Sequence, residues 1–250
     1  MPGTLYIVST PIGNLEDITF RAVRILKEVG IIAAEDTRHT KQLCAHFGIG
    51  TTITSYHDFN KEEKAPVLLE RLQSGASVAL VSDAGTPVVS DPGYFLITRS
   101  IEAGIPIVPV PGPTAVLAAL VGSGLPTDAF RFEGFLPRKP GARNKRIESF
   151  RDEHASLILF ESPHRIEKLL MALREGLGNR RVALCRELTK HYEEYRRGTI
   201  EELLLDVRKR PPKGEITVVV EGQPRRRTSR LEEEESSTTD NEGGVDYSEA

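Results

Sequence analysis

The chain has 250 residues, of which 39% are hydrophobic and 28% charged, and a formal net charge of -3. That length and apolar content suffice for one large or two modest globular domains. No apolar run approaches the roughly 20 residues of a membrane helix, and no basic leader with a cleavable apolar region precedes the first expected strand, so we expect a cytoplasmic protein. Two cysteines without CxxC or Cys/His spacing support neither a disulfide scaffold nor a metal site.

The first part of the chain alternates short apolar runs with amphipathic segments. Strands are expected at 5–8, 31–34, around 53, 76–81 and 105–110. Helices are expected between them, at about 18–29, 40–47, 61–72 and 92–104. This alternation predicts an α/β fold with a largely parallel sheet and helices on both faces.

The pattern breaks at Pro111-Gly112-Pro113, where we place a boundary between domains 1–112 and 113–222. The second domain restarts with a helix at 114–121. Its other elements are expected as strands at 130–134, 157–160, 182–185, 193–197 and 216–220, and as a helix at 164–174. Residues 223–250 hold eight acids, four arginines and few apolar side chains, which predicts a disordered acidic tail.

The segment 78–93 indicates a ligand site. Its apolar strand stops abruptly in a loop dense in Asp, Gly and Pro. Ligands of open α/β sheets bind just beyond the carboxyl ends of the strands, and clefts between domains are preferred ligand sites. Phosphate-loop, GxGxxG, HExxH and GxSxG motifs are absent, which argues against nucleotide hydrolysis and dehydrogenase activity.

Several long motifs resemble one family, and they occur in its order over about residues 3–222. The motifs are LYIVSTPIGNLEDIT (5–19), AEDTRHT (34–40), SDAGTPVVSDPG (82–93), VPVPGPTA (108–115), FEGFLP (132–137), ESPHR (161–165), RELTK (186–190) and KGEITV (213–218). Together they resemble the ribosomal RNA small subunit methyltransferase I family of the tetrapyrrole methylase superfamily.

The resemblance implies a fold, a cofactor and a substrate. It implies two α/β domains of the tetrapyrrole methylase type, commonly in a homodimer, with S-adenosylmethionine in the cleft between the domains. It implies methylation of a ribose 2'-hydroxyl of a cytidine in the decoding centre of small-subunit (16S) ribosomal RNA. Matched position by position, the expected cofactor-binding residues are Thr10, Pro11, Ile12, Gly13, Asp83, Ala84, Gly85, Thr86, Pro87, Pro111, Gly112, Pro113, Thr114, Ala115, Phe135, Leu136, Gly214, Glu215, Ile216 and Thr217. Phe135 and Leu136 have core packing as an equal alternative.

The catalytic candidates follow from the weak nucleophilicity of a ribose hydroxyl, which calls for a base or for a cation that stabilises the alkoxide. They are Asp36, Arg38, His164, Arg165, Glu187 and Lys190. Each of these candidates except Glu187 and Lys190 has a structural alternative. Asp36 and Arg38 could form a structural ion pair, and Arg165 could bind a neighbouring carboxylate. His164 could belong to an ordinary helix start. We therefore expect Glu187 or Lys190 to lie nearest the chemistry.

A basic segment suits an RNA substrate. Residues 138–151 have a local charge of +5, and the expected RNA-binding residues are Arg138, Lys139, Arg143, Lys145 and Arg146. Pro140-Gly141 suggests a mobile arm, with a solvated helix face as the alternative. Two other functions stay open, namely a methyltransferase of tetrapyrrole intermediates and a non-catalytic ribosome-associated RNA-binding protein.

Overall fold

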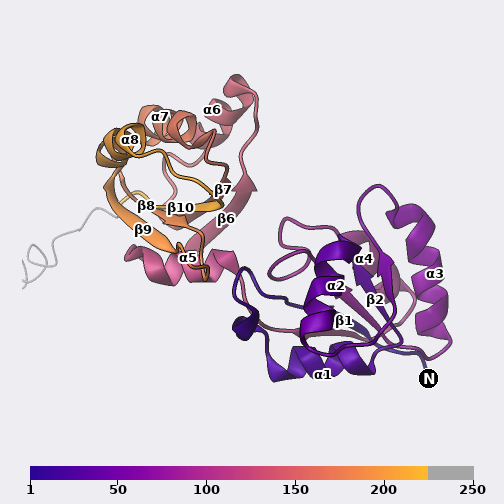
Figure 1. The fold of residues 1–250 in the computed structure, drawn as a ribbon. Coiled ribbons are helices and arrows are strands. Elements are labelled where there is room, and N and C mark those ends of the chain that lie inside the picture. The colour runs from indigo at the N-terminus through magenta and orange to yellow at the C-terminus, as the bar shows by residue number, and fades with distance from the viewer. Residues whose placement is uncertain (225–250) are drawn as a thin grey trace, which may run out of the picture.

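The protein forms two α/β domains that face each other, as Figure 1 shows for the computed structural model, which describes residues 1–224. The expected disordered tail lies outside the described residues except for its first two positions. Within residues 1–224, no helix is long and apolar enough to cross a bilayer.

The first sheet is entirely parallel, with strand order β3-β2-β4-β1-β5. Its strands are β1 (Leu5–Val8), β2 (Ile31–Ala34), β3 (Ile53–Ser55), β4 (Val78–Val81) and β5 (Ile107–Val110). Its helices are η1 (Leu15–Asp17, a single 3-10 turn), α1 (Phe20–Glu28), α2 (Thr37–His46), α3 (Lys61–Gln73) and α4 (Tyr94–Glu102). The largely parallel sheet predicted from the sequence is therefore present in this half of the chain.

The second sheet is mixed, with order β6-β7-β10-β8-β9 and only the β6–β7 pair parallel. Its strands are β6 (Phe130–Phe135), β7 (Ser156–Glu161), β8 (Arg181–Arg186), β9 (Glu194–Thr199) and β10 (Ile216–Val220). Its helices are α5 (Ala115–Ser123), α6 (Pro140–Glu148), α7 (Ile166–Leu177) and α8 (Ile200–Lys209). Because α5 packs on β8 and β10, the chain joins this sheet directly after Pro113. The domain boundary at residue 112 stays a prediction.

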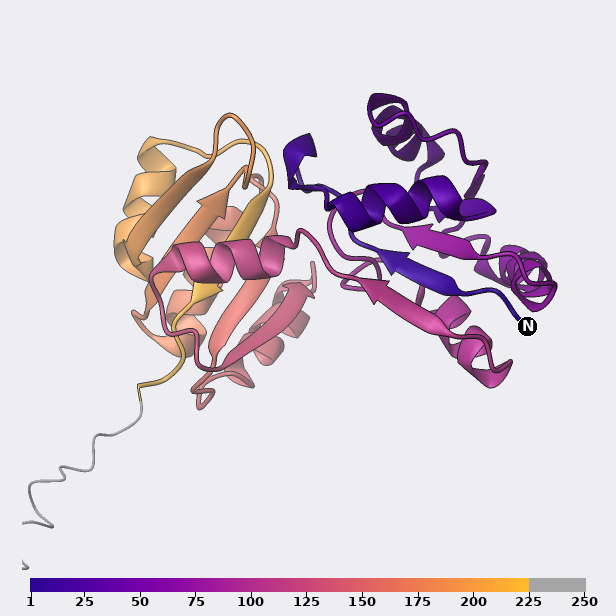
Figure 2. The same cartoon turned by 90° about the horizontal axis from the view of Figure 1, so that it is seen from below.

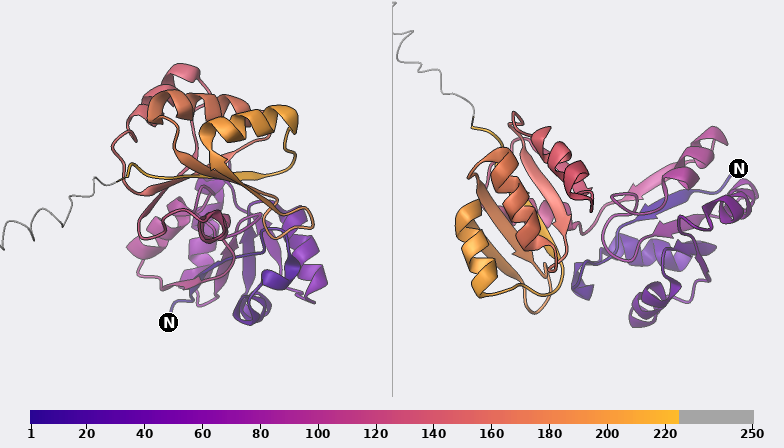
Figure 3. Two further views of the ribbon diagram at one scale, coloured as in Figure 1. Left: turned by 90° about the vertical axis from the view of Figure 1, so that its left-hand side faces the viewer. Right: turned by 90° about the horizontal axis from the view of Figure 1, so that it is seen from above.

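Each sheet is covered on both faces, because successive strand residues point to opposite sides. In β10, Val218 and Val220 enter the core under α6, α7 and α8, whereas Val219 enters the core under α5. In β4, Leu80 packs towards α3 and α4 and Val81 towards α1 and α2. Figure 3 shows the resulting layers from two sides. Buried on both faces, these strands read as continuous apolar runs.

The prediction of a mobile arm at 138–151 is wrong, because most of this segment is helix α6. Pro140 occupies the first turn, where its missing N–H costs nothing. Ile147 and Phe150 are fully buried and anchor the segment in the core of the second domain. Arg131 and Arg146 also stack on the Phe150 ring. The sequence alternative, a helix with one solvated basic face, matches the structure.

Helix α2 begins at Thr37, earlier than the expected 40. The side chain of Asp36 accepts a hydrogen bond from the N–H of Arg38 and so caps the first turn. This start places His39 and Gln42 at the carboxyl edge of the first sheet, beside the loop that follows β4.

Candidate functional site

Three loops of the first domain are tied together at the carboxyl ends of β1, β4 and β5. The N–H and C=O of Thr10 pair with those of Gly85 at 2.9 and 3.0 Å. The hydroxyls of Ser9 and Thr86 lie 2.9 Å apart, and the Thr86 hydroxyl donates to the Pro113 carbonyl at 3.3 Å. These bonds fix the backbone of all three Gly/Pro motifs and so form the cleft floor.

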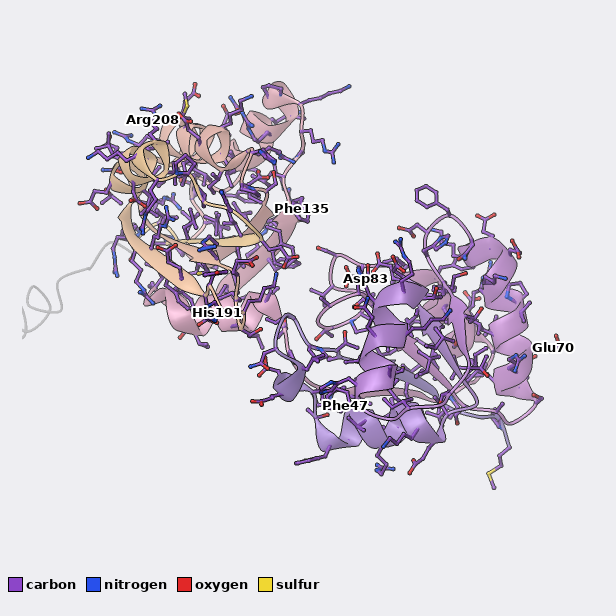
Figure 4. All side chains as sticks on the ribbon, in the orientation of Figure 1. Phe47, Glu70, Asp83, Phe135, His191 and Arg208 are labelled. Atoms are coloured by element: carbon purple, nitrogen blue, oxygen red, sulfur yellow. The ribbon has the colours of Figure 1, made fainter. Side chains whose placement is uncertain are left out.

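Opposite this floor stands the second domain, and an apolar cavity of about 360 Å³ lies between them. Figure 4 labels Asp83 and Phe135 on the two facing sides. Phe135 is 60% exposed and packs against Phe160, whereas Leu136 is buried in the domain core. The position of Leu136 matches the core-packing alternative. Phe135 instead lies at the wall of the apolar cavity.

The expected cofactor residues divide into three groups. Those at the apolar cavity are Ile12, Ala84, Gly85, Thr86, Thr114, Ala115, Phe135, Gly214, Glu215, Ile216 and Thr217. Those at a second, more polar cavity are Thr10, Pro11, Gly13 and Asp83, with Ile12, Ala84 and Glu215 shared by both. Those lining neither cavity are Pro87, Pro111, Gly112, Pro113 and Leu136. Gly112 packs closely against Ser9 of the cleft floor, where a Cβ on residue 112 would lie only 2.9 Å from Cβ of Ser9.

Several wall residues were missed from the sequence. They are Val89, Asp91, Val116, Phe160, Glu161, Ser162, Pro163, Cys185 and Leu188. Glu161, Ser162 and Pro163 belong to the motif ESPHR, and Asp91 belongs to SDAGTPVVSDPG. Because both motifs lie at strand ends, their place in the sequence could have identified these residues as part of the cavity wall. Cys185 was not assigned beyond core filling; burial raises the pKa of its thiol to about 12, which makes it an inert wall group.

Backbone strain is concentrated beside the cleft. In the described chain, the non-glycine residues with positive φ are Val88, Ser90, Glu187 and Thr189. Positive φ is costly for a β-branched residue, and such strain persists only where the surrounding structure enforces it. A Cβ on Gly134 of β6 would lie 2.8 Å from Oγ of Ser90, which shows how closely the second domain approaches this loop.

Glu187 and Lys190 form an ion pair at the cleft edge. The Lys190 ammonium donates to Glu187 at 3.1 Å and to Glu215 at 3.0 Å. Partial burial opposes the charged form of Lys190, but these two hydrogen bonds outweigh it and raise its pKa. The N–H of Glu215 lowers the pKa of Glu187, with Lys190 adding to the effect. Both groups are therefore charged at neutral pH, which favours Lys190 as a stabilising cation over either group as a base.

Asp36 and Arg38 form an exposed pair on α2. Hydrogen bonds from Arg38 hold the pKa of Asp36 well below its usual range. The N–H of Asp36 donates to Asp83 at 2.9 Å. Neither Asp36 nor Arg38 lines a cavity. The pair caps α2 and holds Asp83, which matches the structural alternative.

Arg165 lies behind the apolar cavity. Its guanidinium contacts the Glu161 carboxylate at 3.2 Å and donates to the Leu136 carbonyl at 3.0 Å. The Glu161 side chain is 1% exposed, and burial raises its pKa although Ser162 N–H and Arg165 oppose this. His164 is exposed and lines neither cavity.

Replacing Arg165 by Ala should lower the free energy of unfolding by about 3 kcal/mol, because it leaves the Glu161 carboxylate buried without its ion-pair partner. Urea unfolding measures this change. The control is Arg174→Ala on the same helix, which removes an exposed pair with Glu201 and should cost about 1 kcal/mol or less. Equal losses in the two variants would contradict the buried-pair argument.

The basic residues of α6 lie on the second domain. Arg138, Lys139 and Lys145 are exposed, and Arg146 is held by Glu133. Arg143 is half-buried and acts on Glu161 through its charge. Three of the five expected RNA-binding side chains therefore stand clear on the surface.

The sequence profile of the tetrapyrrole (corrin/porphyrin) methylases matches residues 4–204. The ribosomal RNA small subunit methyltransferase I of Halalkalibacterium halodurans is 53% identical over 220 residues, covering 88% of this chain and 76% of that protein. The Bacillus subtilis protein of the same name is 47% identical over 220 residues, covering 88% and 75%. Uroporphyrin-III-C-methyltransferase from Thermus thermophilus (TM-score 0.62, 23% identity, covering 87% and 94%) and diphthine synthase (TM-score 0.67, 17% identity, covering 88% and 90%) share the fold.

The two facing α/β domains and the cleft between their loops define a methyltransferase of the tetrapyrrole methylase type. Within that class, the chain belongs to the ribosomal RNA small subunit methyltransferase I family.

Proposed function

We propose that the protein transfers a methyl group from S-adenosylmethionine to a ribose 2'-hydroxyl of a cytidine in the decoding centre of small-subunit (16S) ribosomal RNA. Membership in a family whose named members act on ribosomal RNA of the small subunit carries this proposal. The cleft supports the methyl donor, because its apolar cavity is bordered by rigid backbone and by polar strand ends.

The residues at the apolar cavity fit S-adenosylmethionine. Ile12, Phe135 and Phe160 offer apolar contact for the adenine, and Gly214, just before the central strand β10, offers its backbone groups. The Asp91 carboxylate lines the cavity, and its negative charge favours the positive sulfonium. The bound donor supplies an activated methyl group, so the protein chiefly contributes orientation and activation of the acceptor.

The test is mass mapping of ribose methylation in small-subunit ribosomal RNA incubated with the purified protein and S-adenosylmethionine, with a parallel incubation that holds a tetrapyrrole intermediate in place of the RNA. One new 2'-O-methylcytidine is expected in the decoding centre. Methylation of the tetrapyrrole and not of the RNA would support the first alternative function. A protein that binds the RNA but gives no heat with S-adenosylmethionine would support the non-catalytic one.

Charge reversal at both Lys139 and Lys145 should weaken RNA binding, because both side chains are exposed, Lys139 just before α6 and Lys145 within it, and stand in no ion pair within residues 1–224. If each contacts a phosphate, the slope of log affinity against log salt falls by about 1.4 for single-stranded RNA. Filter binding over a salt series measures the slope. Lys27→Glu with Lys64→Glu on the first domain changes the net charge equally and should leave the slope unchanged.

We further propose that the protein is a homodimer and that it is cytoplasmic. Helix α5 is apolar all round, and its Leu117 and Val121 side chains are 47% and 74% exposed in the single chain. Exposed apolar side chains on one helix suit an interface between subunits. Sedimentation equilibrium distinguishes a dimer of the 27.6 kDa chain from a monomer.

A further inference from the structure

The cleft contains two chambers that share a wall. The apolar chamber is the 360 Å³ cavity described above, and the polar chamber is the neighbouring cavity of about 480 Å³. Ile12, Ala84 and Glu215 line both chambers. Two ligands that occupy the chambers would therefore meet at these three residues. If the methyl donor takes the apolar chamber, the polar chamber stands where the methyl acceptor has to lie.

Both domains contribute to the polar chamber. The first domain supplies Thr10, Pro11, Gly13, His39 and Asp83 among others, and the second domain supplies Lys190 beside the shared Glu215. Figure 2 shows η1, which starts at Leu15, between the two domains. The volume lies in the range of about 300–1,000 Å³ typical of small-molecule sites, and the lining offers amide, hydroxyl, imidazole and ammonium groups. Such a lining suits the sugar and base edges of a nucleoside.

Lys190 lines the polar chamber and contacts Glu215, which lines both chambers. Two of the three N–H bonds of its ammonium point to Glu187 and Glu215, which leaves the third for an acceptor in the chamber. Its stem packs on Gly13, where a Cβ would collide with Cγ of Lys190. Glu187 in turn accepts from the N–H of Glu215 at 2.9 Å and is a positioning residue. The ammonium is thus held rigidly, which is what stabilisation of a developing negative charge requires.

His39 faces the same chamber from the first turn of α2. Its Nδ1 lies 3.5 Å from Oδ2 of Asp83, and Oδ1 of Asp83 accepts from the N–H of Asp36 at 2.9 Å. With Nδ1 beside this carboxylate, Nε2 is the ring nitrogen left to act on a ligand. Imidazole is the side chain most often used to move a proton near neutral pH. Asp83 is the positioning residue of this pair.

We propose that the polar chamber receives the nucleoside to be methylated, turned out of its strand, with Lys190 donating to the accepting ribose oxygen and His39 taking its proton. The inference rests on the proposed function. It reassigns Thr10, Pro11 and Gly13 from cofactor binding to substrate binding. The oxygen–methyl bond forms as the carbon–sulfur bond of the donor breaks, the electron pair of that bond stays on sulfur, and the hydroxyl proton passes to Nε2 of His39. Enzymes that modify nucleotides commonly extrude the target in this way.

The experiment compares His39→Gln, Lys190→Met and Gly13→Ala with the control Lys41→Met, an exposed lysine of α2 outside the chamber. Three quantities are measured on the full chain. They are the affinity for S-adenosylmethionine by calorimetry, the single-turnover rate on small-subunit ribosomal RNA, and the fluorescence of a pyrimidine analogue at the target position without the donor.

His39→Gln and Lys190→Met should lower the single-turnover rate by about 100-fold each while donor affinity stays within about twofold. Gly13→Ala, which keeps the charge but displaces it, should lower the rate by about tenfold and, like Lys190→Met, reduce the fluorescence change on RNA binding. Lys41→Met should match the unmodified protein throughout.

Variants that behave like Lys41→Met would overturn the proposal. So would a tenfold loss of donor affinity with an unchanged fluorescence response, since this would assign the polar chamber to the amino-acid end of the donor. Failure of the unmodified protein to methylate ribosomal RNA is a separate result, which overturns the proposed function and the chamber assignment with it.

Discussion

Gly85→Val is expected to reduce the affinity for S-adenosylmethionine by at least tenfold and to lower the melting temperature by about 4–8 °C. Gly85 has a φ of +81°, and it exchanges two backbone hydrogen bonds with Thr10. A β-branched residue at this φ costs about 2 kcal/mol, which corresponds to that temperature shift in a chain of this size. A Cβ at position 85 would also lie 3.3 Å from Cγ2 of Ile12 on the cavity wall.

The matched control is Gly104→Val, in the turn after α4. Gly104 has a φ of +69°, and a Cβ there would meet nothing within 4 Å. The control should lose similar stability but keep its donor affinity. Calorimetric titration and thermal unfolding of both variants separate the two effects. Normal donor affinity in Gly85→Val would show that the bridge between Thr10 and Gly85 does not shape the donor site.

Asp91→Asn is expected to change stability and donor affinity in opposite directions. Asp91 lines the apolar chamber, and burial raises its pKa, with Asp83 adding to this and a hydrogen bond from Ser82 opposing it. Because the raised pKa means that folding disfavours the charged carboxyl, the Asn variant should gain about 1 kcal/mol or less of stability, or about 2–4 °C in melting temperature. Affinity for the sulfonium should fall roughly tenfold through the loss of a nearby opposite charge.

The uncharged product of the reaction provides the internal control. S-adenosylhomocysteine carries no charge on sulfur, so its affinity for Asp91→Asn should stay within about twofold of the unmodified protein. In the unmodified protein, the preference for the sulfonium over this thioether should weaken as the pH falls through the raised pKa of Asp91, while the same group stops destabilising the fold. Equal losses for both ligands would mean that Asp91 acts through shape rather than charge.

Local patterns were sufficient for much of the fold. The apolar runs at 5–8, 31–34 and 216–220 became buried strands, because a strand covered on both faces needs apolar side chains at every position. The loop after β4 was predicted to bind a ligand from its Gly and Pro residues at a strand end, and the loops after β1 and β5 were predicted to do so from the family resemblance; the structure brings all three together. Helix α6 was misjudged, although Pro140 at its start, Ile147 near its end and Phe150 just after it carried the signal.

The sequence by itself determined the class of the fold and the family to which the chain belongs, because these depend on residues that are neighbours along the chain, and it predicted the strand ends as ligand sites. The tertiary structure alone decided which of those groups meet. His39 joins Asp83, Lys190 joins Gly13 and Glu215, and Asp91 enters the chamber wall, through contacts that span up to about 180 positions. Folding within each domain sets the His39–Asp83 and Lys190–Glu215 contacts, whereas packing between the domains sets the Lys190–Gly13 contact. Neither leaves a periodic trace in the chain.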